Sequence, residues 1–393
     1  MHRWPISLVA LTLALGCRDQ TRSGSPRPSP SAAPTGQPSS TRARGPHHAP
    51  VASESVDIPS GTVRAGSRPG VEGRHPQIEP IETSIELGGY SIDRLAYPND
   101  PRLPPLTGVT RDEAKARCAE RGSRLCTELE WERACRGPNN DEYSTGLRFE
   151  VPCSKHPFSC ASGFDVLAMG VAVREWTASD VLDPDTSASR GAAVRGAPAS
   201  APAGDHRCAH REAVDPDKSW PDVGFRCCRG APNAVKVVEP RLGKAYRRPH
   251  LALERIKALL AANPRTAAFA EDFILWREPD AANTVLERGS GDRRGLTFSV
   301  APVIWNPVAG ATYLVITGRS GKDTSMVLAY YVLGRDDYQL ASSFIMKSET
   351  GPVALAYDDS IRPRLFFSTC WQCLGETGKV IYRDPDSVAI VQP

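Results

Sequence analysis

Cysteine is the residue type with the greatest potential for chemistry in this chain of 393 residues, which contains 11 of them. Cys370 and Cys373 have the C-x-x-C spacing of a redox-active dithiol. The motif CWQC lacks the tryptophan that precedes it in thioredoxin and the helix start that would lower a thiol pKa. We therefore favour a structural bridge in a turn, with a redox site as the alternative.

Three more cysteines lie in residues 110–137, which also contain two helix-start signals. Thr110 with Glu113, and Thr127 with Glu130, have the spacing of a capping box, in which hydroxyl and carboxylate satisfy backbone N–H groups reciprocally. Two short helices are therefore predicted, each starting just after its threonine. Helices this short depend on tertiary packing. Their predicted buried positions are Ala114, Cys118, Trp131 and Cys135.

The same segment resembles a known protein family. AKARCAERGSRLCTELEWERACRG is similar to the central segment of the formylglycine-generating enzyme family, the sulfatase-modifying-factor domain. Four later stretches resemble further segments of that domain in the same order: VREWTASD, VRG, RCAHR and VGFRC. The resemblance covers roughly residues 81–230. It implies an α+β domain with an irregular, loop-rich fold of the C-type-lectin-like kind.

The first 17 residues have the features of an export signal. A short basic beginning is followed by an apolar run from Ile6 to Leu15, which is too short to span a bilayer. The run ends in Leu-Gly-Cys and resembles a bacterial lipoprotein signal, which would make Cys17 the acylated first residue. Several acyl chains would anchor the protein to a membrane of the cell envelope. The alternative is an ordinary secretory signal with an incidental cysteine.

Residues 18–80 are rich in Ser, Pro, Gly, Ala and Arg, and no aromatic residue occurs between Arg18 and Tyr90. Such a composition buries too little apolar surface to offset chain entropy, so we predict a disordered tether. Its arginines and the His47-His48 pair could touch an anionic surface, but we favour a solvated linker. The 48 basic and 45 acidic side chains of the whole chain leave a net charge of +3. Nothing in this balance indicates a nucleic-acid partner.

Disulfides are expected in an exported chain. Ten cysteines besides Cys17 make an even number, which favours up to five bridges. The family resemblance implies two of them, Cys118 with Cys227 and Cys135 with Cys208.

The other bridges are predicted from the residues themselves. Cys126 occupies a position where the family usually has proline, and Cys228 is an additional cysteine, so we predict that these two pair. Adjacent residues of a strand face opposite sides, which lets Cys227 and Cys228 serve different partners. Two local candidates are Cys153 with Cys160 and Cys370 with Cys373.

The resemblance also locates the catalytic positions. Active family members hold copper between two cysteine thiolates, ten and five residues before the cysteine matched here by Cys208. Pro198 and Ala203 occupy these positions, and neither side chain can bind a metal. We therefore predict no catalytic residue and no formylglycine formation in this domain.

His206, His210 and Glu212 spell H-x-x-x-H-x-E, a pattern that binds iron in the related sulfoxide-synthase enzymes. There it lies on a helix, whereas the resemblance places it here in an extended segment. Residues four apart in a strand are separated by about 13 Å, too far for one metal ion. We therefore do not expect iron, which stays an alternative.

Family members bind calcium near the segment matched by residues 171–180. Glu175 could supply an oxygen ligand, but Val171 and Ala172 replace the usual Gly-Asn pair. Backbone carbonyls could still coordinate calcium. We favour a structural role for Glu175, with calcium as the alternative.

The chain after the resemblance divides into a linker, residues 233–248, and a last domain, residues 249–393. LALERIKALLAAN is predicted to form an amphipathic helix, and TAAFAEDFILW a second helical stretch. Short β runs separated by turn signals follow, which favours an antiparallel sandwich, barrel or set of meandering sheets. Tyr330 and Tyr331 are interpreted as cross-strand packing.

The domain expectations are a signal over residues 1–17, a tether over 18–80 and a sulfatase-modifying-factor-like domain over 81–232, followed by the linker and the β-rich domain. We expect a non-catalytic binding or scaffold module at the cell envelope, with a protein or glycan partner and no cofactor. One alternative is an active metal-dependent oxidase. The other is that the C-terminal β domain carries the function.

Overall fold

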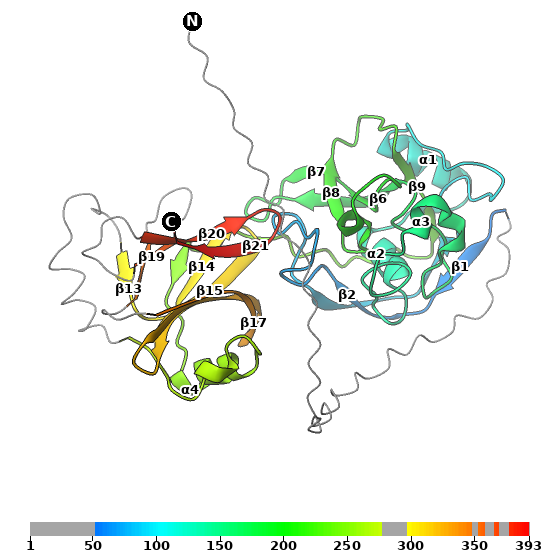
Figure 1. Ribbon diagram of the computed structural model, residues 1–393. Coiled ribbons are helices and arrows are strands. Elements are labelled where there is room, and N and C mark those ends of the chain that lie inside the picture. Colours follow the sequence, from blue (N-terminus) through cyan, green and yellow to red (C-terminus); the bar gives the residue numbers. More distant parts are fainter. Residues whose placement is uncertain (1–51, 277–296, 348–352, 358–364, 369–376, 393) are drawn as a thin grey trace, which may run out of the picture. The chain divides into compact units, whose positions relative to one another are not determined.

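The computed structural model describes residues 52–276, 297–347, 353–357, 365–368 and 377–392 (Figure 1). Cys17, Cys370 and Cys373 lie outside these residues, so the lipidation of Cys17 and the last bridge stay predictions. Within the described residues, no helix has the length and apolarity needed to cross a membrane.

Two short helices, α1 (Arg111–Glu120) and α2 (Glu128–Arg136), begin where the capping boxes predict. At each start, the threonine hydroxyl accepts a hydrogen bond from the backbone N–H three residues on, and the glutamate there accepts one from the threonine N–H. The residues predicted to face the core, Ala114, Cys118, Trp131 and Cys135, are all buried.

Ten short strands accompany these helices. Their bounds are β1 Ser55–Ile58, β2 Gly61–Ala65, β3 Thr83–Leu87, β4 Tyr90–Asp93, β5 Arg124–Leu125, β6 Arg174–Leu182, β7 Ser189–Arg195, β8 Arg211–Val214, β9 Val223–Phe225 and β10 Cys227–Arg229. One sheet has the order β1-β4-β10-β5 and another the order β8-β7-β6-β9, while β2 and β3 form a separate pair. Pairing is antiparallel except between β6 and β9.

The predicted tether is wrong for residues 52–80. β1 pairs with β4 along its whole length, and β2 pairs with β3. Ile58 and Val63 are buried in core clusters, and the charged side chains of Arg74 and Glu79 are fully buried. Composition averaged over a long polar stretch concealed two short strands whose partners lie later in the chain.

Four disulfides connect the elements of this region. The structure contains the two bridges implied by the resemblance, Cys118–Cys227 and Cys135–Cys208, and the predicted Cys126–Cys228. The two adjacent cysteines of β10 reach different core clusters, one around Trp176 and the other around Trp131. The predicted local bridge joins Cys153 in α3 (Pro152–Lys155) to Cys160 after the 3-10 turn η1 (Pro157–Ser159).

The predicted linker is anchored rather than free. Val237 packs against Val63 and Leu129 in one core cluster. Glu239 forms an ion pair with Arg211, with a guanidinium nitrogen 2.8 Å from a carboxylate oxygen. The end of the predicted linker is itself a strand, β11 (Tyr246–Arg247), which pairs with the last domain.

The C-terminal region forms two antiparallel sheets. Their strands are β11, β12 Phe273–Ile274, β13 Thr297–Ser299, β14 Val303–Val308, β15 Ala311–Ser320, β16 Thr324–Gly334, β17 Asp337–Lys347, β18 Ala354–Tyr357, β19 Leu365–Ser368, β20 Thr377–Arg383 and β21 Ser387–Val391. One sheet has the order β11-β14-β15-β16-β17 with β12 beside β15, and the other the order β13-β18-β19-β20-β21. The predicted run FSVAPVIW is divided by Pro302 between the two sheets.

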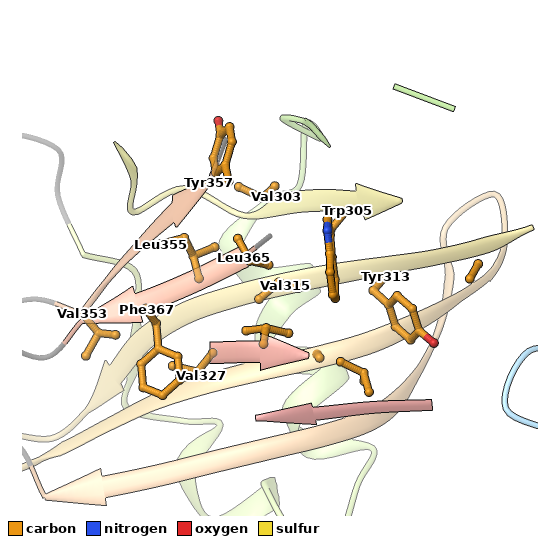
Figure 2. Packing of buried hydrophobic residues seen from close by; sticks show 14 residues of the cluster. Val303, Trp305, Tyr313, Val315, Val327, Val353, Leu355, Tyr357, Leu365 and Phe367 are labelled. Atoms are coloured by element: carbon orange, nitrogen blue, oxygen red, sulfur yellow. The ribbon is translucent and has the colours of Figure 1, made fainter. Parts of the chain in front are cut away.

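Side chains from both sheets share one apolar core, so the region is a β-sandwich (Figure 2). Val315 and Val327 come from the larger sheet, and Leu355 and Phe367 from the smaller one. Tyr331 lies against Tyr313 with ring centroids 5.4 Å apart, in keeping with the predicted cross-strand packing.

The helical lead-in is shorter than predicted. The first predicted helix is α4 (Leu253–Ala261), which packs Ile256 and Leu260 on the larger sheet. The second is wrong: TAAFAEDFILW contains only the turn η3 (Ala267–Phe269) and strand β12, which pairs with β15. The apolar end of this segment pairs with the end of β15, and no local sequence pattern predicts that pairing. The α+β class with a mainly antiparallel C-terminal domain is confirmed.

Candidate functional site

The loop between β7 and β8 contains the positions where the family resemblance places the copper-binding cysteines. Pro198 closes a turn by accepting a hydrogen bond from the Ala201 N–H at 2.9 Å. Ala203 is exposed at the start of the 3-10 turn η2 (Ala203–His206). Cys208, just beyond η2, is consumed by its disulfide. The loop therefore offers no thiolate to a metal ion.

The other cysteines of the described residues are also bound in disulfides. The four disulfides use every cysteine between residues 52 and 276, and the other described ranges contain none. A disulfide sulfur is neither a nucleophile nor a thiolate ligand. Thiol chemistry is thus excluded for the described part of the chain in its oxidised form.

His206 does not join His210 and Glu212 in an iron site. Its ring stacks on Phe149 at a centroid distance of 4.4 Å, and its nitrogens lie 2.8 Å from the Gly170 carbonyl and 3.2 Å from that of Ala201. Both ring nitrogens are therefore occupied by backbone groups. The alternative H-x-x-x-H-x-E ligand set, which was not expected from the sequence, is not assembled, because η2 turns the first histidine into the protein interior.

Glu79 is the buried centre of the region beside this loop. It accepts hydrogen bonds from both terminal nitrogens of Arg207 at 2.8 Å, from the Ser67 hydroxyl at 2.6 Å and from the His75 N–H at 3.2 Å. The Nδ1 of His210 lies 3.8 Å away. Burial alone would raise the pKa of Glu79, but His210 and Arg207 outweigh it and hold the pKa far below its usual range.

His210 lies between two carboxylates. Its Nε2 is 3.3 Å from Glu212, which also accepts a hydrogen bond from Arg174 at 2.8 Å. Burial lowers the pKa of His210, but Glu212 and Glu79 raise it more strongly, to about 9. The imidazole is therefore charged at neutral pH, and its positive charge lies between the two carboxylates of Glu79 and Glu212.

Two residues far from His210 in sequence complete a cluster with it. His75 and Asp205 lie 3.9 Å apart, measured from Nε2 to Oδ1, and the rings of His75 and His210 meet edge to face at 5.7 Å. His75 and Asp205 also line an open pocket of about 660 Å³. The pocket is bordered by Gly73, Pro76, Gln77, Ile78, Arg190, Pro202, Asp384 and Pro385.

Glu175, for which calcium binding was the alternative, is fully engaged by protein groups. Arg226 donates to both carboxylate oxygens at 2.6 and 2.7 Å, and the Trp131 indole N–H donates to one of them at 2.8 Å. All three side chains are buried. Glu175 therefore has the structural role favoured from the sequence, and its carboxylate is not presented to a calcium ion.

A second buried ionic network holds α2 against β7 and β8. Glu128 contacts Arg195 at 3.1 Å and Arg211 at 3.0 Å. Arg195 also reaches Glu132, and Arg211 reaches Glu239. Buried charges need such pairing, and these arginines fix the strands that flank the candidate loop.

A family model described as "Sulfatase-modifying factor enzyme 1-like domain" matches residues 93–158. This match identifies part of the chain as a sulfatase-modifying-factor-like domain. One curated relative, "Inactive C-alpha-formylglycine-generating enzyme 2" of Bos taurus, is 32% identical over 158 residues, which is 32% of this chain. The match spans half the length of that relative.

Solved structures that are similar to this chain share little sequence with it. PvdO from Pseudomonas aeruginosa is 17% identical with a TM-score of 0.36, covering 45% of this chain and 94% of that one. CarF is 17% identical with a TM-score of 0.34, covering 45% and 98%. Treponema denticola variable protein 1 is 14% identical with a TM-score of 0.33, covering 44% and 94%.

Sequence reasoning therefore found part of the site in the sulfatase-modifying-factor domain. It singled out His210 and Glu212, which do lie together, but grouped them with His206 instead of His75 and Asp205. His75 fell inside the stretch interpreted as tether. A strand-like alternation around Ile58 and Val63 was the available signal that this stretch is folded.

Proposed function

We propose that this chain is an exported lipoprotein of the bacterial cell envelope whose sulfatase-modifying-factor domain is non-catalytic and serves as a binding or scaffold module. One observation carries the proposal. Every cysteine of the described residues forms a disulfide, while Pro198 and Ala203 stand at the two positions where the family resemblance requires thiolates. A framework held by these bridges retains the fold without the copper ligands.

The relative from Bos taurus supports the non-catalytic interpretation, because its name describes an inactive formylglycine-generating enzyme. The lipid anchor at Cys17 would hold the module at a membrane of the envelope. A protein or glycan of the envelope is the proposed partner. The near balance of 48 basic and 45 acidic side chains argues against nucleic acid.

The catalytic part of the proposal is tested by aldehyde formation. The intact oxidised protein, incubated with copper and a cysteine-containing sulfatase peptide, should yield no more aldehyde than copper alone. Thiol titration under native conditions should find no reactive thiol at residues 118–228. Aldehyde above the copper control would establish an active oxidase and overturn the non-catalytic assignment.

The anchor is tested on the intact chain in a bacterial host. Wild-type protein should fractionate with membranes and carry an acylated residue at Cys17, whereas Cys17→Ala should be soluble or retained as the uncleaved precursor. An unmodified wild-type Cys17 in the mature protein would reject the lipoprotein part of the proposal.

The C-terminal sandwich is a second candidate for the functional surface. An open pocket of about 730 Å³ is lined mostly by apolar and aromatic residues, together with Gln77, Lys379 and Asp384. Two variants of the whole protein compare the surfaces. One carries a photo-crosslinking residue in place of Lys379, and the other carries it in place of Asp217 of the sulfatase-modifying-factor domain. A partner that crosslinks only at position 379 would show that the sandwich is the binding surface.

A further inference from the structure

His75, Asp205 and His210 each present one potential metal-binding atom, and these three atoms all lie within 4.8 Å of one another. Two imidazoles and a carboxylate are ligands that Zn²⁺ accepts in sites that retain an open position. We propose that His75, Asp205 and His210 form a Zn²⁺ site, with a fourth position open to the adjoining pocket. This inference does not depend on the proposed envelope function.

Only a small movement is needed to reach metal-binding distances. Tetrahedral Zn²⁺ with bonds of about 2.0–2.2 Å requires ligand atoms about 3.3–3.5 Å apart. His75 and Asp205 are already 3.9 Å apart, and their side chains are 47% and 28% exposed. Both can rotate toward an ion, while the buried His210 supplies a fixed ligand.

His210 provides an independent indication of a ligand. The residue is only 4% exposed, yet its Nδ1 has no hydrogen-bond partner, because Glu79 is too distant at 3.8 Å. Each ring nitrogen nevertheless faces a carboxylate, Glu79 at Nδ1 and Glu212 at Nε2. Whichever nitrogen binds the ion, the other therefore has the carboxylate neighbour that orients metal-binding histidines.

The surroundings also supply the charge and the access that a cation needs. Glu79, Glu212 and Asp205 place three carboxylates around the imidazole of His210. Bound Zn²⁺ would place its positive charge among these carboxylates. Because His75 and Asp205 line the open pocket, an ion can enter without opening the core.

The other cluster of potential ligands among the described residues consists of Glu150, Cys153 and Cys160. It does not compete with the proposed site, since its two cysteines are joined in a disulfide and offer no thiolate. His206 is likewise committed to backbone carbonyls. Of these two clusters, only the one of His75, Asp205 and His210 lies beside a pocket and has no ligand atom bound in a disulfide.

Zn²⁺ titration of the full-length oxidised chain against a chromophoric chelator tests the proposal. All forms carry His47→Asn and His48→Asn, so that this adjacent pair cannot contribute. The parent protein should bind one equivalent, and His75→Asn, Asp205→Asn and His210→Asn should each weaken binding at least about tenfold. The matched exposed controls His156→Asn and Asp217→Asn should bind like the parent.

Thermal unfolding separates loss of a ligand from loss of the fold. Without metal, His75→Asn and Asp205→Asn should unfold at the parent temperature, because both side chains are at the surface. Zn²⁺ should raise the unfolding temperature of the parent and the controls but not of these variants. Parent-like Zn²⁺ affinity in both His75→Asn and Asp205→Asn, or no stoichiometric binding by the parent, would overturn the proposal.

Discussion

Arg226 holds both carboxylate oxygens of Glu175, at 2.6 and 2.7 Å, and each side chain is 1% exposed. This pair ties the start of β6 to the residue between β9 and β10, so it connects two sheets as well as two charges. The same two oxygens of Glu175 would have to bind a calcium ion, so Arg226 competes with calcium at this carboxylate.

We therefore predict that calcium does not bind to the Glu175 carboxylate. A Ca²⁺ ion would have to displace Arg226 and the Trp131 N–H from a buried carboxylate. We expect no change in unfolding temperature when millimolar Ca²⁺ replaces a chelator. A rise in the wild type that Glu175→Gln abolishes would instead identify a calcium ligand.

Breaking the ion pair between Arg226 and Glu175 should strongly destabilise the fold. Arg226→Met leaves the Glu175 carboxylate buried without its partner, a situation that typically costs about 3–5 kcal/mol of unfolding free energy. Denaturant unfolding measures the loss. The exposed pair Arg102–Asp100 is the matched control, and Arg102→Met should unfold like wild type. The double variant Arg226→Met with Glu175→Gln should recover part of the loss; no recovery would mean that packing dominates.

The disulfides should differ in their contributions according to the loops they close. Cys135 and Cys208 are 73 residues apart, whereas Cys153 and Cys160 are 7 apart. With the neighbouring bridges in place, chain-entropy estimates give about 3–4 kcal/mol for the Cys135–Cys208 bridge and about 2 kcal/mol for the short one. Paired Cys→Ala variants compared by urea unfolding check this order. Equal losses would show that local packing around each bridge outweighs loop closure.

The capping box of α2 should contribute measurably. Thr127→Ala removes the hydroxyl that accepts the Glu130 N–H, and we expect a loss of about 1 kcal/mol. Thr127→Ser keeps that oxygen and should unfold close to wild type. A serine variant as unstable as the alanine variant would point to the methyl group instead of the cap.

Stability should fall at alkaline pH because of His210. Its folded pKa of about 9 lies above the usual 6.5, raised by Glu212, Glu79 and Asp205 against the effect of burial. The folded state thus binds the proton more tightly than the unfolded state. The resulting stabilisation is fully present below pH 6.5 and is lost as the pH rises toward 9.

Urea unfolding at a series of pH values measures this effect in metal-free protein. The wild type should become less stable between pH 6.5 and 9, and His210→Asn should show a flatter profile. Arg207 and Arg174, which face the same carboxylates, keep their charges throughout this range. An equally steep decline in His210→Asn would assign the titration to another group.

The features found from the sequence are those whose causes lie close together in the chain. Thr110 and Thr127 reveal helix starts because each cap is completed three residues later. The α4 helix has the periodic apolar side that was expected. The bridge from Cys126 to Cys228 was found because two departures from a family pattern occur as a matched pair. Strand β12 was missed because its partner residues in β15 lie 45 and 47 positions further on, so no local pattern indicates the pairing.

The sequence by itself determined the short capped helices, the β-rich C-terminal half and the absence of cysteine at positions 198 and 203. The disulfide set within residues 118–228 was predicted only with the help of the family resemblance. Only the tertiary structure decided that His210 meets His75 and Asp205 while His206 turns inward. It also decided that Arg226 occupies Glu175. The physical reason is that ion pairs and ligand clusters depend on distances between residues brought together by folding, and these distances are not encoded in any local spacing.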